Sequence, residues 1–110
     1  MDALLRHKTT RRAVFDAALE HAREHGAREA LLLNERGEIT EGAFTSVFLL
    51  RDGRLLTPPV SCGLLPGTLR AALLRKGWAE EAVLTPEDLR QGRLFVGNSV
   101  RGLIPARLVP

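Results

Sequence analysis

The chain has 110 residues, of which 45% are hydrophobic and 26% charged, and its formal net charge at pH 7 is +3. The hydrophobic fraction excludes an intrinsically disordered chain, and the low aromatic content of 5% argues against a nucleic-acid surface built on stacked rings. No apolar run reaches the roughly 20 residues that cross a bilayer, and the single cysteine, Cys62, suits a reducing compartment, so we predict a cytoplasmic protein without membrane contact.

The first predicted element is a helix over residues 10–26, capped by Thr9 or Thr10 and ended by Gly26. Its apolar residues recur at the spacing of one helix face: Phe15, Ala18, Leu19 and Ala22. A short apolar run at residues 29–34 then predicts a buried strand, and Arg36-Gly37 predicts a turn after it.

A second strand is predicted over residues 44–50. Both of its alternating sets of side chains are apolar, so we expect it to be covered on both faces. The turn sequence of residues 51–54 joins it to residues 55–57, which predicts a β-hairpin that Pro58 and Pro59 end.

The remaining elements alternate between helices and strands. Residues 66–68 lead into a helix over 69–76 that Gly77 closes, and Thr85-Pro86 predicts a further helix start. Short strands are predicted over residues 82–84, 94–96 and 103–108, the last two flanking a loop over 97–102. Helices and strands therefore interleave, which predicts a single mixed α/β domain over residues 1–110.

Lys8 is one of only two lysines in the chain. A primary amine can form a Schiff base with an aldehyde and can later act as a base, whereas the guanidinium of arginine stays protonated. Lys76, the other lysine, already has a structural explanation as a cation near the exposed carbonyls at a helix end. Lys8 is therefore a candidate catalytic amine.

Three further places could carry chemistry. Gly67-Thr68 at a helix start offers backbone amides to an anion such as a phosphate, although many helices begin this way only to cap themselves. Glu41 beside an apolar strand could pair with a protonated ring nitrogen, the alternative being a solvated turn residue. Ser99, with Asn98, could donate to a phosphate from a loop that is otherwise an ordinary turn.

In this order the four places resemble the C-terminal half of the class IV, or fold type IV, pyridoxal phosphate enzymes. The resemblance covers essentially the whole chain. The similar segments are His7-Lys8-Thr9-Thr10-Arg11-Arg12, residues 34–42 with Thr45-Ser46-Val47-Phe48, Gly63-Leu64-Leu65-Pro66-Gly67-Thr68-Leu69-Arg70, and residues 98–106.

The resemblance implies a mixed sheet or pseudo-barrel with flanking helices, and pyridoxal 5'-phosphate as the cofactor. It implies that Lys8 is the Schiff-base lysine and that Glu41 keeps the pyridine nitrogen protonated, so that the ring can act as an electron sink. It also implies that the backbone amides of Thr68 and Leu69 and the hydroxyl of Ser99 hold the cofactor phosphate.

Within this family the segment around Lys8 is most similar to 4-amino-4-deoxychorismate lyase, in particular the lyase half of fused para-aminobenzoate synthases. The implied reaction forms 4-aminobenzoate and pyruvate in folate biosynthesis, with Lys8 first as anchor and then as general base. A branched-chain or D-amino-acid aminotransferase is the alternative. Such enzymes usually carry a tyrosine a few residues after the lysine, where this chain has Ala13 and no tyrosine at all.

The resemblance begins at the catalytic lysine, whereas family members have an N-terminal domain before it and form homodimers. It therefore implies a missing N-terminal domain that supplies the rest of the cleft, and an isolated chain of low activity. The alternative from another class is a noncatalytic scaffold or interaction domain. The two alternatives differ in geometry, because the enzyme requires Lys8, Glu41, Thr68 and Ser99 to line one cleft.

Five other side chains have ordinary interpretations. His21 and His25 share a helix face but lack an obvious third ligand, so no metal site is predicted. Trp78 is expected to anchor packing at a helix end. Arg70 is expected to support the phosphate loop or to form a surface ion pair, and Arg101 could meet a substrate carboxylate.

Overall fold

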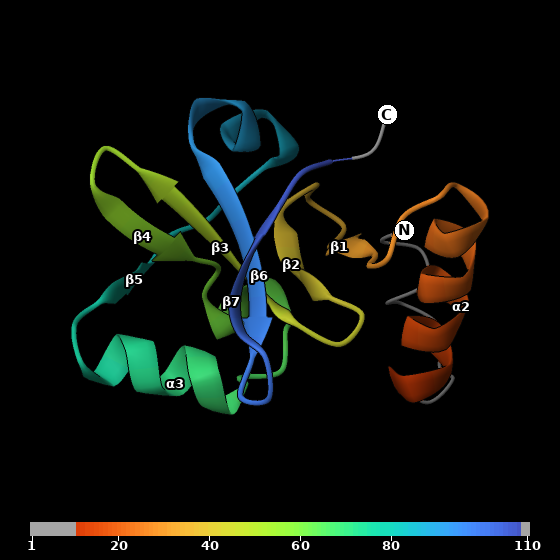
Figure 1. The fold of residues 1–110 in the computed structure, drawn as a ribbon, viewed down its shortest axis with the longest axis horizontal. Coiled ribbons are helices and arrows are strands. Elements are labelled where there is room, and N and C mark those ends of the chain that lie inside the picture. The colour runs from red at the N-terminus through yellow and green to blue at the C-terminus, as the bar shows by residue number, and fades with distance from the viewer. Residues whose placement is uncertain (1–10, 109–110) are drawn as a thin grey trace.

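The structure is a computed structural model that describes the backbone of residues 11–108 and the side chains of residues 15–108. The prediction for Lys8 and the caps proposed at Thr9 and Thr10 lie outside these residues. The described elements form a mixed α/β fold with one two-stranded and one five-stranded sheet, together with flanking helices (Figure 1). The predicted fold class is confirmed in its mixed-sheet form.

The first described helix, α2 (Arg11–Glu24), stands beside the two-stranded sheet in Figure 1. Its predicted apolar face is confirmed: Ala18 is fully buried in a cluster with residues of the following segment, and Phe15, Leu19 and Ala22 pack against that cluster. Gly26 adopts a positive φ of 79° after the last turn, a conformation that glycine reaches without steric cost. The helix is therefore held in place by its hydrophobic stripe.

The two-stranded sheet contains a strand that the sequence analysis did not predict. Strand β1 (Leu31–Leu33) agrees with the predicted strand, and it pairs antiparallel with β2 (Ile39–Gly42). All four residues of β2 are buried, including Thr40, whose hydroxyl donates to the carbonyl of Leu32 at 3.1 Å. The sequence pattern did not predict this strand because two of its four residues are polar, and the burial of polar residues depends on distant partners.

The five-stranded sheet has the order β5-β4-β3-β6-β7. Its central strand packs both faces as predicted: Val47 and Leu49 lie in one hydrophobic cluster, and Phe48 lies in another with Leu73 of the second helix. The hairpin turn at Asp52 and Gly53 has positive φ at both residues, as a tight two-residue turn requires. The bounds of these strands are β3 (Ser46–Arg51), β4 (Arg54–Thr57), β5 (Ala79–Glu81), β6 (Arg93–Asn98) and β7 (Gly102–Ala106).

Strand β5 corrects the prediction of a strand over residues 82–84. The strand lies three residues earlier and pairs parallel with β4, with Leu55 opposite Ala79 and Thr57 opposite Glu81. Ala79 is buried against the sheet, whereas the two glutamates after it are exposed, so the segment has no apolar alternation to reveal it. Its strand character comes from pairing with a distant segment.

Helix α3 (Thr68–Arg75) connects β4 to β5 and covers one face of the sheet (Figure 1). Lys76 follows its last turn, as predicted, and its ammonium lies 4.8 Å from the centre of the Trp78 ring. Trp78 itself is 64% exposed, so the prediction of a packing anchor is wrong. The ring stacks under a cation at the surface, where its faces stay partly in water.

Two short 3₁₀ helices complete the fold. One, η1 (Val60–Cys62), buries Cys62, and burial raises the pKa of its thiol, which favours the neutral form. The other, η2 (Pro86–Gln91), begins with a capping box between Thr85 and Asp88, which confirms the predicted helix start. Within residues 11–108 no helix is long and apolar enough to cross a membrane.

Candidate active site

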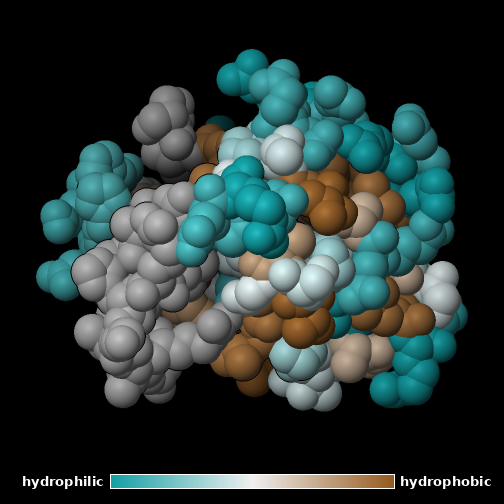
Figure 2. Space-filling view, turned by 180° about the vertical axis from the view of Figure 1, so that it is seen from behind, coloured by the Kyte–Doolittle hydropathy of each residue, from teal (hydrophilic) through white to brown (hydrophobic). Residues whose placement is uncertain are grey.

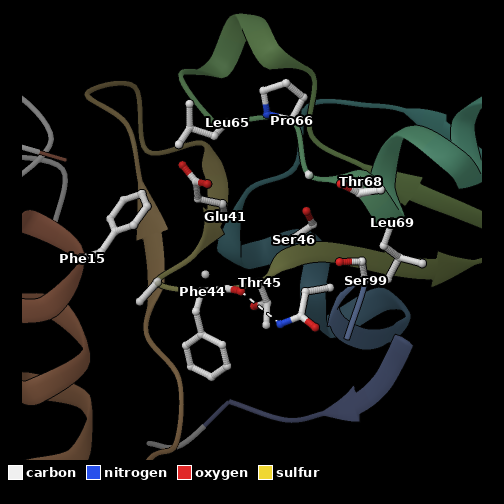
Figure 3. Close-up of a pocket in the computed structure, with 14 residues that line it drawn as sticks. Phe15, Glu41, Phe44, Thr45, Ser46, Leu65, Pro66, Thr68, Leu69 and Ser99 are labelled. Atoms are coloured by element: carbon white, nitrogen blue, oxygen red, sulfur yellow. Dashed lines mark hydrogen bonds between the residues drawn. The ribbon is translucent and has the colours of Figure 1, made fainter. Parts of the chain in front are cut away.

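A pocket of about 250 Å³ lies where four separate segments of the described chain meet. One segment is the end of β2 with the loop after it, the second is the start of α3, the third is the β6–β7 turn, and the fourth is α2 through Phe15. Figure 3 shows Phe15 and Glu41 on one side, Thr68, Leu69 and Ser99 on the other, and Ser46 between them. We call this cavity the first pocket; its lining is Phe15, Glu41, Gly42, Ala43, Phe44, Thr45, Ser46, Leu65, Pro66, Gly67, Thr68, Leu69, Asn98 and Ser99.

The predicted site residues that the structure describes come together here. Glu41, Thr68, Leu69 and Ser99 all line the first pocket, although 58 positions separate the first from the last. Lys8, the fifth, lies outside the described residues. The geometric requirement of one cleft is therefore met by the four residues for which it can be examined.

Glu41 is 6% exposed and belongs to strand β2, so the alternative interpretation as a solvated turn residue is wrong. Burying a neutral polar group without a hydrogen bond costs about 2–7 kcal/mol, and burying a charged carboxylate without a partner costs more. Its position on a strand fixes it more firmly than a loop would. A buried carboxylate that lines a pocket is suited to hold a cationic or protonated group there.

The start of α3 offers backbone donors to the first pocket. The residue before the helix, Gly67, is extended (φ −84°, ψ 163°), and no side chain caps the first turn among the described residues. The amides of Thr68 and Leu69 therefore have no intrahelical partner, and the positive end of the helix dipole lies beside them. Gly67 is an ordinary N-cap residue, and because no side chain bonds to the first turn, these amides can donate to a ligand.

Two glycines allow the walls of this pocket to approach each other. A Cβ at Gly67 would lie 3.1 Å from the hydroxyl oxygen of Ser46, and a Cβ at Gly97 would lie 2.9 Å from Cδ2 of Leu69. The missing side chains let the first turn of α3 pack directly against strands β3 and β6. Gly97 thus positions the turn that carries Ser99.

The β6–β7 turn is ordered by Asn98. Its side-chain oxygen accepts hydrogen bonds from the amides of Val100 (3.1 Å) and Arg101 (2.9 Å), and its side-chain nitrogen donates to the carbonyl of Phe44 at 3.3 Å. The guanidinium of Arg101 lies 5.9 Å from the centre of the Phe44 ring. The exposed hydroxyl of Ser99 is therefore presented by a turn that is tied to the loop after β2.

Sequence reasoning did not identify every residue at this site. Ser46, Phe44 and Thr45 line the pocket, and only the similarity of residues 45–48 to the family pointed to that region.

Arg70 corrects another expectation: it is 4% exposed and not a surface residue. Its guanidinium donates to the carbonyl of Pro58 at 3.0 Å and pairs with Glu81 at 2.5 Å, so it fastens α3 to the end of β4 and to β5.

A second cavity of about 300 Å³ lies at the far end of the five-stranded sheet, between η2 and the β6–β7 pair. Exposed guanidinium groups surround its apolar lining. We call it the second pocket; it is lined by Leu89, Arg90, Gly92, Arg93, Leu94, Pro105, Ala106, Arg107 and Leu108. Within the part of the chain that the structure describes, no group of three or more His, Cys, Asp or Glu residues is arranged to hold a metal ion.

Comparison with known proteins places these features in context. The family model for class IV amino-transferases matches residues 1–109. A branched-chain-amino-acid aminotransferase of Escherichia coli K12 is 34% identical over 94 residues, which are 80% of this chain and 30% of that protein. A Schizosaccharomyces pombe protein named "Putative aminodeoxychorismate lyase" is 32% identical over 109 residues, 94% of this chain and 47% of that protein.

Solved structures agree with these matches. The crystal structure of a Mesorhizobium loti protein named "Putative amino-acid aminotransferase" is 55% identical in sequence and has a TM-score of 0.85. The match covers 99% of this chain and 54% of that protein. A branched-chain aminotransferase of Thermobaculum terrenum in its pyridoxal phosphate form is 26% identical, with a TM-score of 0.76, and this chain covers 33% of it. The chain thus spans between 30% and 54% of the length of these proteins.

Proposed function

We propose, from the premise that the chain belongs to the class IV amino-transferase family, that it forms part of a pyridoxal-phosphate-dependent aminodeoxychorismate lyase. The reaction would convert 4-amino-4-deoxychorismate to 4-aminobenzoate and pyruvate, a step of folate biosynthesis. The observation that carries the proposal is the meeting of a buried carboxylate, Glu41, with the uncapped start of α3 and the Ser99 turn in one pocket.

Members of the family use pyridoxal phosphate, and the residues of the first pocket fit that group. An anion would meet the free amides of Thr68 and Leu69 and the hydroxyl of Ser99 at one end of the pocket. A protonated ring nitrogen would meet the carboxylate of Glu41 at the other. These donors and this acceptor match a molecule that carries a phosphate and a basic ring nitrogen on opposite sides.

Each residue then has a distinct task. Glu41 would hold a proton on the ring nitrogen, and the α3 amides with Ser99 would fix the phosphate and so orient the ring. Lys8 would hold the cofactor covalently and would later take the proton from the carbon that bears the substrate amine. Pyridoxal phosphate supplies an electron sink for that carbon when it is bound.

An amino-acid aminotransferase is the second candidate. It is favoured by the identity of 55% to the Mesorhizobium loti protein, whose name assigns it to that class. The lyase is favoured by the wording of the sequence around Lys8 and by the absence of any tyrosine from the chain, since aminotransferases of this fold usually use one beside the cofactor. Both reactions need the same cofactor contacts, so they differ in substrate and product.

We also propose that the complete site includes a further domain and a second subunit. The coverage of 54% of the Mesorhizobium loti protein supports this, as do the exposed apolar side chains at the mouth of the first pocket, where Phe44 is 44% and Leu65 56% exposed. Figure 2 shows hydrophobic residues gathered in the middle of the rear face, with hydrophilic residues above them and to the right. A cytoplasmic location is part of the proposal, supported by the single buried thiol of Cys62.

The cofactor contacts can be tested on the 110-residue chain. Pyridoxal phosphate is titrated against the wild type, Lys8→Ala and Glu41→Gln, with absorbance and fluorescence as readouts. We expect a spectral change in the wild type that Lys8→Ala abolishes, and an affinity lower by about a hundredfold to several thousandfold in Glu41→Gln, since a buried ion pair that loses one partner costs about 3–5 kcal/mol. Arg93→Gln, in the second pocket, is the matched control and should bind as the wild type does.

The reaction is tested by following pyruvate release from aminodeoxychorismate and amino-group transfer from branched-chain and D-amino acids. Both assays use the chain alone and the chain mixed with the N-terminal half of the Mesorhizobium loti relative. Pyruvate release without amino transfer supports the lyase, and the reverse supports the aminotransferase. Absence of cofactor binding both in the chain alone and in its mixture with the N-terminal half would contradict both enzymes and leave the noncatalytic scaffold.

A further inference from the structure

The carboxylate of Glu29 accepts four hydrogen bonds, and three of them come from the loop between β2 and β3. Its Oε1 accepts from the amides of Ala30 (2.7 Å) and Ala43 (2.8 Å), and its Oε2 accepts from the amide of Phe44 (3.1 Å) and the hydroxyl of Thr45 (2.8 Å). Glu29 itself is not part of the pocket lining. It lies behind the loop and ties it to the residues before β1.

The loop closes so tightly around this carboxylate that a side chain at position 42 would force the side chains of Glu29 and Thr45 to move. A Cβ there would lie 2.6 Å from Oε2 of Glu29 and 2.8 Å from its Cδ, both far inside van der Waals contact. The amide of Gly42 meanwhile donates to the carbonyl of Thr45 at 2.8 Å. Since residues 42–46 all line the first pocket, the carboxylate of Glu29 shapes one wall of the pocket from outside.

The same loop holds the opposite wall. The carbonyl of Phe44 accepts the side chain of Asn98, and the oxygen of that side chain accepts the two amides that close the β6–β7 turn. In Figure 3 a dashed line marks the contact between this loop and Asn98. A continuous path of hydrogen bonds therefore runs from Glu29 through Phe44 and Asn98 to the turn that carries Ser99.

We propose that Glu29 is a positioning residue of this site, which sets the place of Ser99 through the Phe44 carbonyl and the Asn98 side chain. The inference rests on the proposed function, because the positioned group, the hydroxyl of Ser99, is taken to donate a hydrogen bond to an anion. Glu29 would not touch the ligand. Its task is to fix the position of the β6–β7 turn relative to the loop after β2, so that Ser99 and the start of α3 can bind the same anion.

The chemistry of the four donors explains why this residue is a carboxylate. All four groups that face Glu29 donate hydrogen bonds, and three of them are backbone N–H groups that cannot accept. A glutamine amide would bring an N–H₂ group against at least one backbone N–H, whichever way it turned. Glu29→Gln therefore disrupts the loop with almost no change in side-chain size.

The test compares the wild type, Glu29→Gln and the control Glu20→Gln, which removes the same charge from the exposed face of α2. The readouts are the backbone amide resonances of residues 98–101 without ligand and the affinities for inorganic phosphate and pyridoxal phosphate. We expect Glu29→Gln to shift the Val100 and Arg101 resonances and to weaken both affinities about tenfold, as expected for one lost hydrogen bond to a charged group. Glu20→Gln should change neither.

Thr45→Val provides a milder arm if Glu29→Gln does not fold, because it removes only the hydroxyl that donates to Oε2. It should shift the same resonances by less. If either folded variant disturbs residues 42–45 but leaves the 98–101 resonances in place, Glu29 is a local structural residue and the inference is wrong. The resonances need no ligand, so this failure is distinct from failure of the proposed function, in which the wild type binds neither anion.

Discussion

The two pockets of this domain are similar in volume but differ in how they are built. The first draws on four separate segments and contains a buried carboxylate, a helix start without a side-chain cap, and hydroxyl groups. The second lies between neighbouring elements, and its polar side chains are exposed arginines such as Arg90 and Arg107. Volume alone would favour the second pocket, at about 300 Å³ against about 250 Å³.

The polar groups that line a pocket are therefore a better guide to a candidate site than the volume of the pocket. Glu41 places a buried carboxylate in the wall of the first pocket, and the start of α3 adds backbone donors to the same cavity. Arginines at the rim of an apolar groove cost little, because water solvates their charges.

Gly97→Ala and Gly92→Ala should cost similar stability but have different effects on binding. The new Cβ at position 97 would collide with the backbone oxygen of Gly102 and with Leu69 of the first pocket, and that at position 92 with the backbone of Leu50 and the side chain of Leu49. Each should lower the free energy of unfolding by about 1–3 kcal/mol, the usual cost of overpacking. Chemical denaturation measures that cost.

Only Gly97→Ala should also abolish detectable binding of pyridoxal phosphate at a temperature where both variants remain folded. Equal loss of binding in the two variants would mean that general destabilisation, and not the shape of the first pocket, controls the ligand. Equal retention would show that the approach of β6 to α3 is not needed for it.

Ser99→Ala and Arg107→Gln test which cationic or polar group binds a phosphate. Removing the Ser99 hydroxyl should weaken the affinity for pyridoxal phosphate about tenfold, because a hydrogen bond to a charged group is lost. Arg107→Gln removes a full positive charge from the second pocket and should change the affinity less than about twofold, since an exposed charge is screened. Fluorescence titration at two salt concentrations measures both, and a larger effect of Arg107→Gln would favour the second pocket.

Asp88→Ala should destabilise the region of the second pocket without affecting the first. The pKa of Asp88 is lowered, chiefly by the backbone amide of Thr85, which donates to its carboxylate at 2.8 Å. A lowered pKa stabilises the fold above the ordinary value of 3.8, and this contribution is lost as the pH falls through the folded pKa. We expect a loss of about 1 kcal/mol at pH 7, the usual contribution of a cap, and no loss in strong acid.

Thermal unfolding from pH 2 to pH 7 measures this difference, with Glu87→Ala in the same turn as the control. The carboxylate of Glu87 is largely exposed, and its nearest cation, Arg90, is 3.9 Å away. Affinity for pyridoxal phosphate at pH 7 should be unchanged in Asp88→Ala. A constant difference in stability at all pH values would show that the carboxylate acts through packing and not through its charge.

The smallest effect concerns Cys62, which lies in η1, just before the segment that leads into the first pocket. Its thiol is buried, and burial, followed by the nearby Glu38 carboxylate, raises its pKa. Alkylation by iodoacetamide should therefore be slow in the folded chain and should increase at a higher pH than in the unfolded chain. Rapid alkylation near neutral pH would show that this segment opens, and the first pocket with it.

Elements with a local signature could be predicted from the sequence. The apolar stripe around Ala18 predicted α2, and the turn at Asp52-Gly53 predicted the β3–β4 hairpin. Glu41 and Ser99 were predicted through similarity to a family, and the structure brings both to one pocket. Their chemical roles stay predictions.

Features that depend on distant partners could not be predicted. Strand β2 is buried with a threonine and a glutamate in its middle, and β5 is a strand because β4 lies alongside it. Glu29 gives no signal in the sequence, since nothing near it in the chain shows that 14 residues later a loop will turn its amides toward the carboxylate. In each case the energy comes from hydrogen bonds that exist only once the chain has folded.

The uncapped start of α3 has a consequence for how this protein can change over time. Backbone amides are present whatever the side chain, so almost any replacement of Thr68 or Leu69 keeps the two donors, and only proline would remove one. Alanine substitutions at Thr68 and Leu69 would therefore not reveal any contribution of these two amides to binding. Descendants of this chain could alter the side chains of Thr68 and Leu69, and with them the choice of substrate, while the two backbone N–H donors stay in place.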